Sequence, residues 1–354
     1  MQTISARFER FALLVFKDST TDSASQNCCK FAFCYIGVPK DDATVSAFVT
    51  DRPIVIKTMV NFYEQINRNK ARTGVVMVVF VAFVVVVGWL IGEWAGYGVG
   101  LVPLALTFSS FSALGSYFVG DKLVLGLSGA RPALKEEYFD YYTVVENLSL
   151  AAGTPMPKAY VIESLAMNAF ATGRNPKHAS IAVTTGLLEK LDRSELEGVV
   201  AHEMSHIKDY DILLMSVVAV LVGTVSILAD MAGRSALWGG KRRSERRGGS
   251  GALAIFGLLA VILSPIVANL IKLALSRQRE FLADAQAAKL TRFPEGLARA
   301  LSKISADPNV LETAHSGTAH LFITNPFANA SSKLASLFST HPSVEERIKC
   351  LKEM

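Results

Sequence analysis

Cysteine is scarce in this chain, and the few cysteines present form no recognisable site. The 354 residues include only Cys28, Cys29, Cys34 and Cys350. No two of them have the C-x-x-C spacing of a metal-binding pair, and they do not form the disulfide framework of a small secreted domain. Their arrangement excludes a cysteine-based zinc site and indicates a reducing compartment.

Charged residues are also few in this chain. Charged residues make up 19% of the chain and hydrophobic residues 51%, and the mean hydropathy is +0.33. These values are unusual for a soluble globular protein. The net charge of +5 suits a protein beside anionic lipid headgroups better than a nucleic-acid binder, which needs a basic face. We therefore expect membrane lipids among the partners, and no nucleic acid.

Four long uncharged runs account for the hydropathy. Residues 73–92 form the first run, and residues 94–120 form a second run that turns back near "EWAGYG". Two more runs cover residues 212–229 and 248–271. About 20 apolar helical residues cross a bilayer core, so the sequence predicts a mainly α integral membrane protein with about four hydrophobic helices. For the two later runs, a pair of buried core helices is the alternative.

Basic residues indicate the orientation of these runs. Arg68, Lys70 and Arg72 flank the first run, whereas the turn near residue 95 has no basic residue. Because cytoplasmic flanks carry the excess of Lys and Arg, we expect a multi-pass protein of the cell (inner or plasma) membrane with its N-terminal side in the cytoplasm. The basic segment 239–249 would lie outside if both later runs cross, so full crossing and shallow insertion of that hairpin stay open.

The first 58 residues differ from the rest of the chain. Their apolar stretch "FALLVF" is too short for the core of a signal peptide, and they show no helical or strand period. A basic amphipathic lead-in to the first membrane run begins at Met59. We expect residues 1–58 to be an atypical N-terminal extension, disordered or not native, with Met59 as the functional start.

The stretch "GVVAHEMSHIKD" carries two histidines four residues apart. Upstream, Ser194 and Glu197 have capping-box spacing, which predicts a helix that begins at Ser194. On this helix His202 and His206 share a face, one turn apart, so both imidazoles can reach one Zn²⁺. Glu203 lies roughly 100° around the helix from His202, in the H-E-x-x-H arrangement whose glutamate is a general base. Polar histidines on an ordinary amphipathic helix are the alternative.

A catalytic zinc needs three protein ligands and one open position. No third histidine follows closely after His206, but the predicted helix "SRQREFLADAQAAKL" carries Glu280 and Asp284 at i and i+4. We expect Glu280 to complete a site for one Zn²⁺ per chain, and Asp284 to accept a hydrogen bond from the outer nitrogen of a ligating histidine. A solvated acidic face balanced by nearby arginines is the alternative. A membrane hairpin between the two helices would bring the ligands together at the membrane surface.

From about Met59 to the C-terminus, the chain resembles the HtpX-type membrane zinc metallopeptidases, which share a broader family with the CAAX prenyl-protein proteases. The resemblance rests, in this order, on "NFYEQINRNKARTG", "GWLIG", "MNAFATGRNP", "AHEMSHIKDYD", "SRQREFLADAQAAKL", "HLFITNPF" and "THPSVEERI". It implies a membrane endopeptidase whose catalytic domain faces the cytoplasm. It also implies a zinc ion held by His202, His206 and Glu280, and a catalytic role for Glu203.

Read with this resemblance, the chain divides into a transmembrane hairpin at 59–122 and a zincin-like α+β metallopeptidase domain at 123–354. We expect the domain to carry a small sheet and to be interrupted by a hydrophobic hairpin at 212–275. In the resemblance, "NAFATG" is an edge strand that an extended substrate joins by backbone pairing, with Asn168 and Ala169 as contacts. An ordinary edge strand is the alternative.

The resemblance also places a His–Arg pair, His341 and Arg347, near the zinc. His341 would donate to the oxyanion or cap the zinc in a resting form, and a plain N-terminal helix turn is the alternative. The predicted function is hydrolysis of membrane-protein or peptide substrates, in quality control under stress as the resemblance implies. A CAAX-type processing protease is one alternative. A non-enzymatic scaffold with a structural zinc is another, and in it Glu203 would be dispensable.

Overall fold

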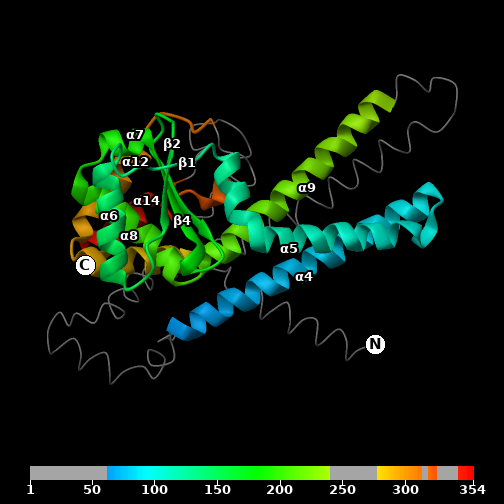
Figure 1. Cartoon of the computed structure of the whole chain (residues 1–354), viewed down its shortest axis with the longest axis horizontal. Coiled ribbons are helices and arrows are strands. Elements are labelled where there is room, and N and C mark those ends of the chain that lie inside the picture. The colour runs from blue at the N-terminus through cyan, green and yellow to red at the C-terminus, as the bar shows by residue number, and fades with distance from the viewer. Residues whose placement is uncertain (1–61, 240–276, 313–317, 325–341) are drawn as a thin grey trace.

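A computed structural model of the chain describes residues 62–239, 277–312, 318–324 and 342–354 (Figure 1). In this part, the fold is mainly helical and contains one small mixed sheet, as the sequence predicts. The expectations for residues 1–58, for the run at 248–271 and for His341 lie outside the described residues.

Two long helices form a hairpin that extends away from the sheet (Figure 1). The hairpin consists of α4 (Phe62–Ala95), the short 3-10 turn η2 (Gly98–Leu101) and α5 (Val102–Leu127). Its two arms are long and apolar enough to cross a membrane, and most of their apolar surface is not buried inside the protein. The chain turns at Gly96, whose φ of 80° favours glycine. The structure has the helical hairpin and the turn near "EWAGYG" that the sequence predicts, and its crossing of a membrane stays a prediction.

A third apolar helix, α9 (Asp211–Gly239), packs against the hairpin. Val218 and Leu221 of α9 are buried in one cluster with Phe80 of α4 and Ala113 of α5. The helix before α9 meets it at an 85° bend, and the described residues hold two candidate spans, or three if this bent pair counts as one. The predicted number of four is therefore not confirmed.

The sheet contains four short strands in the order β1-β2-β4-β3. These are β1 (Arg131–Pro132), β2 (Lys158–Ile162), β3 (Ala169–Gly173) and β4 (Ala179–Thr184). β2 and β4 run parallel, whereas β3 pairs antiparallel with β4 and β1 pairs antiparallel with β2. The "AFATG" strand, β3, is an edge of this sheet, as predicted.

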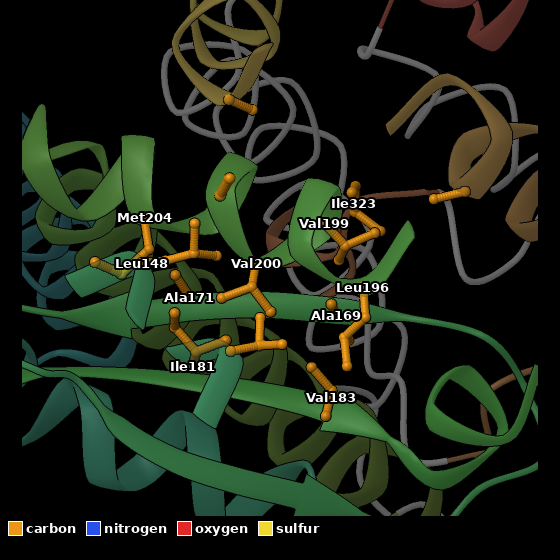
Figure 2. Close-up of a cluster of buried hydrophobic side chains, with 14 of the residues drawn as sticks. Leu148, Ala169, Ala171, Ile181, Val183, Leu196, Val199, Val200, Met204 and Ile323 are labelled. Carbon is orange, nitrogen blue, oxygen red and sulfur yellow. The ribbon is translucent and has the colours of Figure 1, made fainter. Parts of the chain in front are cut away.

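Six helices of the described residues pack with the sheet to form the domain, and α8 (Arg193–Lys208) lies at their centre. They are α6 (Phe139–Ala152), α7 (Thr185–Lys190), α8, α11 (Arg277–Thr291), α12 (Pro294–Ser305) and α14 (Val344–Lys352). Figure 2 shows Val200 of α8 near Ala171 of β3 and Ile181 of β4, and Val199 beside Ile323, all in one buried cluster. Residues 198–207 of α8 are all buried, so the core fixes the position and rotation of this helix.

The start of α8 differs from the prediction. Its N-cap is Asp192, whose side chain accepts a hydrogen bond from the backbone N–H of Glu195, while the Glu195 side chain accepts one from the backbone N–H of Asp192. The predicted capping box of Ser194 and Glu197 is therefore wrong. The Ser194 hydroxyl instead donates to Asp192 at 2.7 Å. Two overlapping pairs have the i, i+3 spacing, and the earlier pair caps the helix.

Candidate metal centre

Three buried side chains from two helices converge on one point. His202 and His206 of α8 lie one turn apart, with their Nε2 atoms 3.2 Å from each other. Glu280, in the first turn of α11, places its carboxylate oxygens 3.6 Å from Nε2 of His202 and 3.8 Å from Nε2 of His206. Each of the three residues is at most 5% exposed. The ligand atoms that the sequence predicts are therefore close enough to hold one ion.

The spacing of these atoms fits a zinc ion. Two nitrogen ligands at about 2.0–2.1 Å from a tetrahedral Zn²⁺ lie about 3.3–3.4 Å from each other, and the observed separation is 3.2 Å. The two imidazoles face the same point with their ring planes at 87°, so each presents its nitrogen edge. Two nitrogens and one carboxylate form a donor set that leaves a fourth position open, as catalytic zinc sites do.

The outer nitrogen of His202 is fixed by residues near the C-terminus. Nδ1 of His202 lies 2.9 Å from Oδ1 of Asp284 on α11, the contact that the sequence predicts. Arg347 of α14 donates to both oxygens of the same carboxylate, from Nε at 2.8 Å and from Nη2 at 2.6 Å. Nη1 of Arg347 also lies 3.6 Å from Glu280. Arg347 is therefore next to the site, and it holds both a ligand and the carboxylate behind another ligand.

The outer nitrogen of His206 is fixed by residues that the sequence analysis missed. Nδ1 of His206 lies 3.1 Å from Oδ2 of Asp211, the first residue of α9. Oδ1 of Asp211 accepts hydrogen bonds from Arg279 at 3.0 Å and from Asn69 at 2.7 Å. On a continuous helix, residues five apart lie about 140° from each other. The spacing of His206 and Asp211 therefore does not indicate that their side chains meet. The bend at Asp209–Tyr210 turns Asp211 back toward the histidine.

Burial and charge shift the pKa values of the site in directions that favour a cation. Burial lowers the pKa of His206, but the hydrogen bond to Asp211 and the charge of Glu280 outweigh burial and raise it to about 9. Burial and Arg347 lower the pKa of His202, and Asp284 and Glu280 raise it by more. Carboxylates that stabilise a proton on an imidazole also stabilise a divalent ion that replaces this proton.

Glu203 is buried beside the ligands without being one of them. Its side chain is 2% exposed. Burial raises the pKa of its carboxyl, and the two histidines offset this effect only in part. A carboxylate with a raised pKa accepts a proton more readily, which suits a general base.

The outer edge of β3 is occupied at both ends. The carbonyl of Ala169 accepts a hydrogen bond from the N–H of Ile323 at 3.0 Å, and the N–H of Ala169 is bonded to the side chain of Asn168. At the other end, the N–H of Gly173 donates to Ser216 of α9. The alternation of an antiparallel ladder places the backbone groups of Ala171 on the same outer edge.

Ile323 connects this edge to the metal centre. Its N–H donates to Ala169 of β3, and its carbonyl accepts a hydrogen bond from Nη1 of Arg347 at 3.5 Å. The structure thus brings together His202, His206, Glu280, Glu203, Asp284 and Arg347. Asn168 and Ala169 lie on the adjoining edge, both buried.

Comparison with known proteins finds a matching family, relatives by sequence and a solved structure. Residues 140–354 match peptidase family M48. The chain is 45% identical to a protease HtpX homolog of Caldanaerobacter subterraneus over 82% of its own length and 97% of the relative. It is 44% identical to a protease HtpX homolog of Tropheryma whipplei over 82% of its own length and 98% of the relative. Among solved structures, S. mikatae Ste24p aligns with a TM-score of 0.42 and 17% identity, covering 95% of this chain and 77% of that one.

Proposed function

The chain belongs to the HtpX-type proteases of peptidase family M48, and from this premise we propose that it is a zinc-dependent endopeptidase with its active site at His202, His206, Glu280 and Glu203. Family membership and the apolar hairpin make it a membrane-bound metallopeptidase. The proposal for the site depends on one observation. Three ligand atoms from α8 and α11 lie within 4.8 Å of one another, in the core of the protein.

One Zn²⁺ per chain would be held by Nε2 of His202, Nε2 of His206 and the carboxylate of Glu280, in a gluzincin-like arrangement. The 3.2 Å separation of the two nitrogens supports zinc. Bound there, Zn²⁺ supplies a Lewis acid that polarises the scissile carbonyl and lowers the pKa of water. Asp284 and Asp211 keep the two imidazoles oriented with Nε2 toward the ion.

Glu203 would carry the proton transfers of peptide hydrolysis. It accepts a proton from the attacking water and passes this proton to the leaving amine. Its burial and its raised pKa support this role, because the same group must accept the proton and then release it. Water is the nucleophile, so no covalent acyl-enzyme forms.

We further propose that an extended segment of substrate pairs with the outer edge of β3. The backbone groups of Ala171 face that edge between the occupied positions Ala169 and Gly173. Asn168 and Ala169, on the N-terminal side of Ala171, remain the proposed substrate contacts. Substrate that reaches Ala169 itself would replace the hydrogen bond from Ile323.

The arrangement of the chain supports a division of labour. Residues 59–122 would form the membrane hairpin, and residues 123–354 would form a zincin-like catalytic domain on the cytoplasmic side of the inner or plasma membrane. The basic residues before the first span favour this orientation. Because the site lies where α8 turns into the apolar helix α9, we propose that the substrates are membrane proteins, degraded in quality control.

The test replaces Glu203 by Gln in the full chain, purified in detergent. We expect cleavage of casein or of a model membrane protein to fall by about 10²–10⁴-fold, with zinc content unchanged. Glu197→Gln is the matched control, because Glu197 lies on the same helix and pairs with Arg193 at the surface. A scaffold with a structural zinc would not distinguish the two variants. Full turnover by Glu203→Gln would refute the proposed catalysis.

A further inference from the structure

The first membrane helix reaches the metal centre through one side chain. Asn69 of α4 is 1% exposed, and its amide nitrogen donates to Oδ1 of Asp211 at 2.7 Å. The same nitrogen donates to the backbone carbonyl of Asp209 at 3.0 Å. Asn69 is thus bonded on both sides of the bend between α8 and α9, about 140 positions along the chain from either partner.

The bend that receives these hydrogen bonds has an uncommon backbone. Tyr210 at its centre has a φ of 61°, in the left-handed region, which costs free energy for a residue other than glycine and needs support from surrounding contacts. α4 supplies part of this support from two successive residues. The Asn69 amide bonds the backbone and side chain of the bend, and Nζ of Lys70 lies 4.4 Å from the centre of the Tyr210 ring.

The carboxylate of Asp211 transmits this support to the ligand. Asn69 and Arg279, from different helices, both donate to Oδ1, which leaves Oδ2 directed at Nδ1 of His206. Two donors from separate elements prevent the carboxylate from rotating about its Cβ–Cγ bond. Without Asn69, Oδ1 of Asp211 would lose one of these two donors, and the carboxylate that orients the imidazole would be less firmly fixed.

We infer that Asn69 is a positioning residue for the metal ligand His206, acting through Asp211, so that the first membrane helix is a working part of the metal centre. This inference rests on the proposed function, because it assumes that His206 binds a metal. The membrane hairpin would then have two tasks. It anchors the protein, and it completes the outer support of one of the two histidines.

The experiment replaces Asn69 by Leu, which has nearly the same size and no donor, in the full chain in detergent. Two readouts do not require catalysis: the zinc dissociation constant from chelator competition, and the visible absorption bands of the Co²⁺-substituted protein. We expect zinc to bind about tenfold more weakly, at the lower end of the effect of residues that orient ligands. The Co²⁺ bands should shift, and kcat should fall more than KM rises.

Ser116→Ala is the matched control, because Ser116 is buried in the same hairpin and, among the residues that the structure describes, its hydroxyl bonds only to the carbonyl of Ala113 in its own helix. Its zinc affinity and Co²⁺ spectrum should equal those of the wild type. Asp211→Asn should weaken zinc binding as well, and Asn69→Leu added to it should have little further effect. Such non-additivity is the signature of residues that act through one another.

Wild-type zinc affinity and an unchanged Co²⁺ spectrum in Asn69→Leu would overturn the inference. So would effects of Asn69→Leu and Asp211→Asn that simply add. If the leucine variant does not fold, Asn69→Ser removes the same donor with a smaller change and is judged by the same readouts. Failure of the proposed function is recognised separately, through undiminished turnover of Glu203→Gln, because the metal readouts do not depend on hydrolysis.

Discussion

The two histidines of the metal centre lie one turn apart on one helix, yet opposite parts of the molecule support them. Nδ1 of His202 contacts Asp284 of α11, and both oxygens of this carboxylate accept hydrogen bonds from Arg347 of α14. Behind His206 is Asp211, at the start of the apolar helix α9, held by Asn69 of the membrane hairpin. His202 is therefore oriented by α11 and α14, whereas His206 is oriented by the membrane-associated helices together with Arg279 of α11.

The two supports differ in construction as well as in origin. Arg347 forms a fork with both oxygens of Asp284, and both side chains are 1% exposed, so this pair is rigid and fully withdrawn from water. Asp211 receives two single hydrogen bonds on one oxygen, from two different helices. The contact of Arg347 with Asp284 joins α14 to α11 next to the site. The contact of Asn69 with Asp211 instead makes the orientation of His206 depend on how α4 packs against α9. On the inference above, the apolar helices would orient a metal ligand as well as anchor the protein.

Removing the carboxylate on the C-terminal side should have the largest effect. In Asp284→Asn, one amide oxygen replaces two acceptors, and the amide NH₂ faces Arg347 or His202. A buried ion pair broken on one side costs about 3–5 kcal/mol of stability, and loss of the partner of a ligating histidine costs about 10–100-fold in metal affinity. We expect both losses, measured by thermal unfolding in detergent and by chelator competition.

Asp140→Asn is the control for this substitution, because Asp140 pairs with Arg193 at the surface with its side chain 79% exposed. Such a pair contributes little to stability, so the control should unfold at the wild-type temperature. A variant at Asp284 that unfolds like the control would show that the arginine fork is not a support, and the contrast between the two histidines would disappear.

Removing the carboxylate on the membrane side should weaken metal binding with a smaller loss of stability. In Asp211→Asn, the single amide oxygen is already used by Asn69 and Arg279, so the NH₂ group faces the N–H of His206. We expect metal affinity to fall by about 10–100-fold. The buried ion pair of Asp211 with Arg279 is weakened as well, but it uses one carboxylate oxygen where Asp284 uses both, so the unfolding temperature should fall less than in Asp284→Asn. The reverse order of the two unfolding temperatures would contradict the proposed difference between the supports.

The first of these supports could be predicted from the sequence, and the second could not. His202, His206, Glu280 and Asp284 form two i, i+4 pairs, and helical periodicity alone places each pair on one face. The length and the apolar content of the runs at 73–92 and 94–120 likewise predict the membrane hairpin. The structure has both helical pairs and the helical hairpin, because these features depend on local geometry. Metal binding by the pairs and membrane crossing by the hairpin stay predictions.

Asp211 escaped prediction because the bend before it has no glycine or proline to mark it. "KDYDIL" reads as a continuation of the helix, and only the left-handed backbone of Tyr210 redirects the chain. Asn69 was not predicted because its partners lie about 140 positions further along the chain, and no local periodicity indicates such a contact. The parallel pairing of β2 with β4 and the position of Ile323 on the edge of β3 are likewise products of tertiary packing.

The smallest expected effect on metal binding concerns Asp209, the other carboxyl at the bend. Burial raises the pKa of Asp209 to about 7, the charge of Asp211 adds to this, and the hydrogen bond from Gln286 opposes it. Within the described part of the chain, Oδ1 of Asp209 has no hydrogen-bond partner. Asp209 therefore differs from Asp211, two residues away, because its buried charge is compensated only in part.

Replacing Asp209 by Asn should stabilise the protein in alkaline solution. The pKa in the folded state, about 7, exceeds the ordinary value, so the folded state binds the proton more tightly than the unfolded state. Wild-type stability is consequently lost as pH rises from about 4 through 7. Asn carries no charge to bury and keeps an oxygen for Gln286. With metal removed from both proteins by chelator, we expect the variant to gain up to about 4 kcal/mol at pH 8 and almost nothing near pH 4. Metal affinity, measured separately, should match that of the wild type, and a variant less stable at pH 8 would show that the charge of Asp209 is compensated after all.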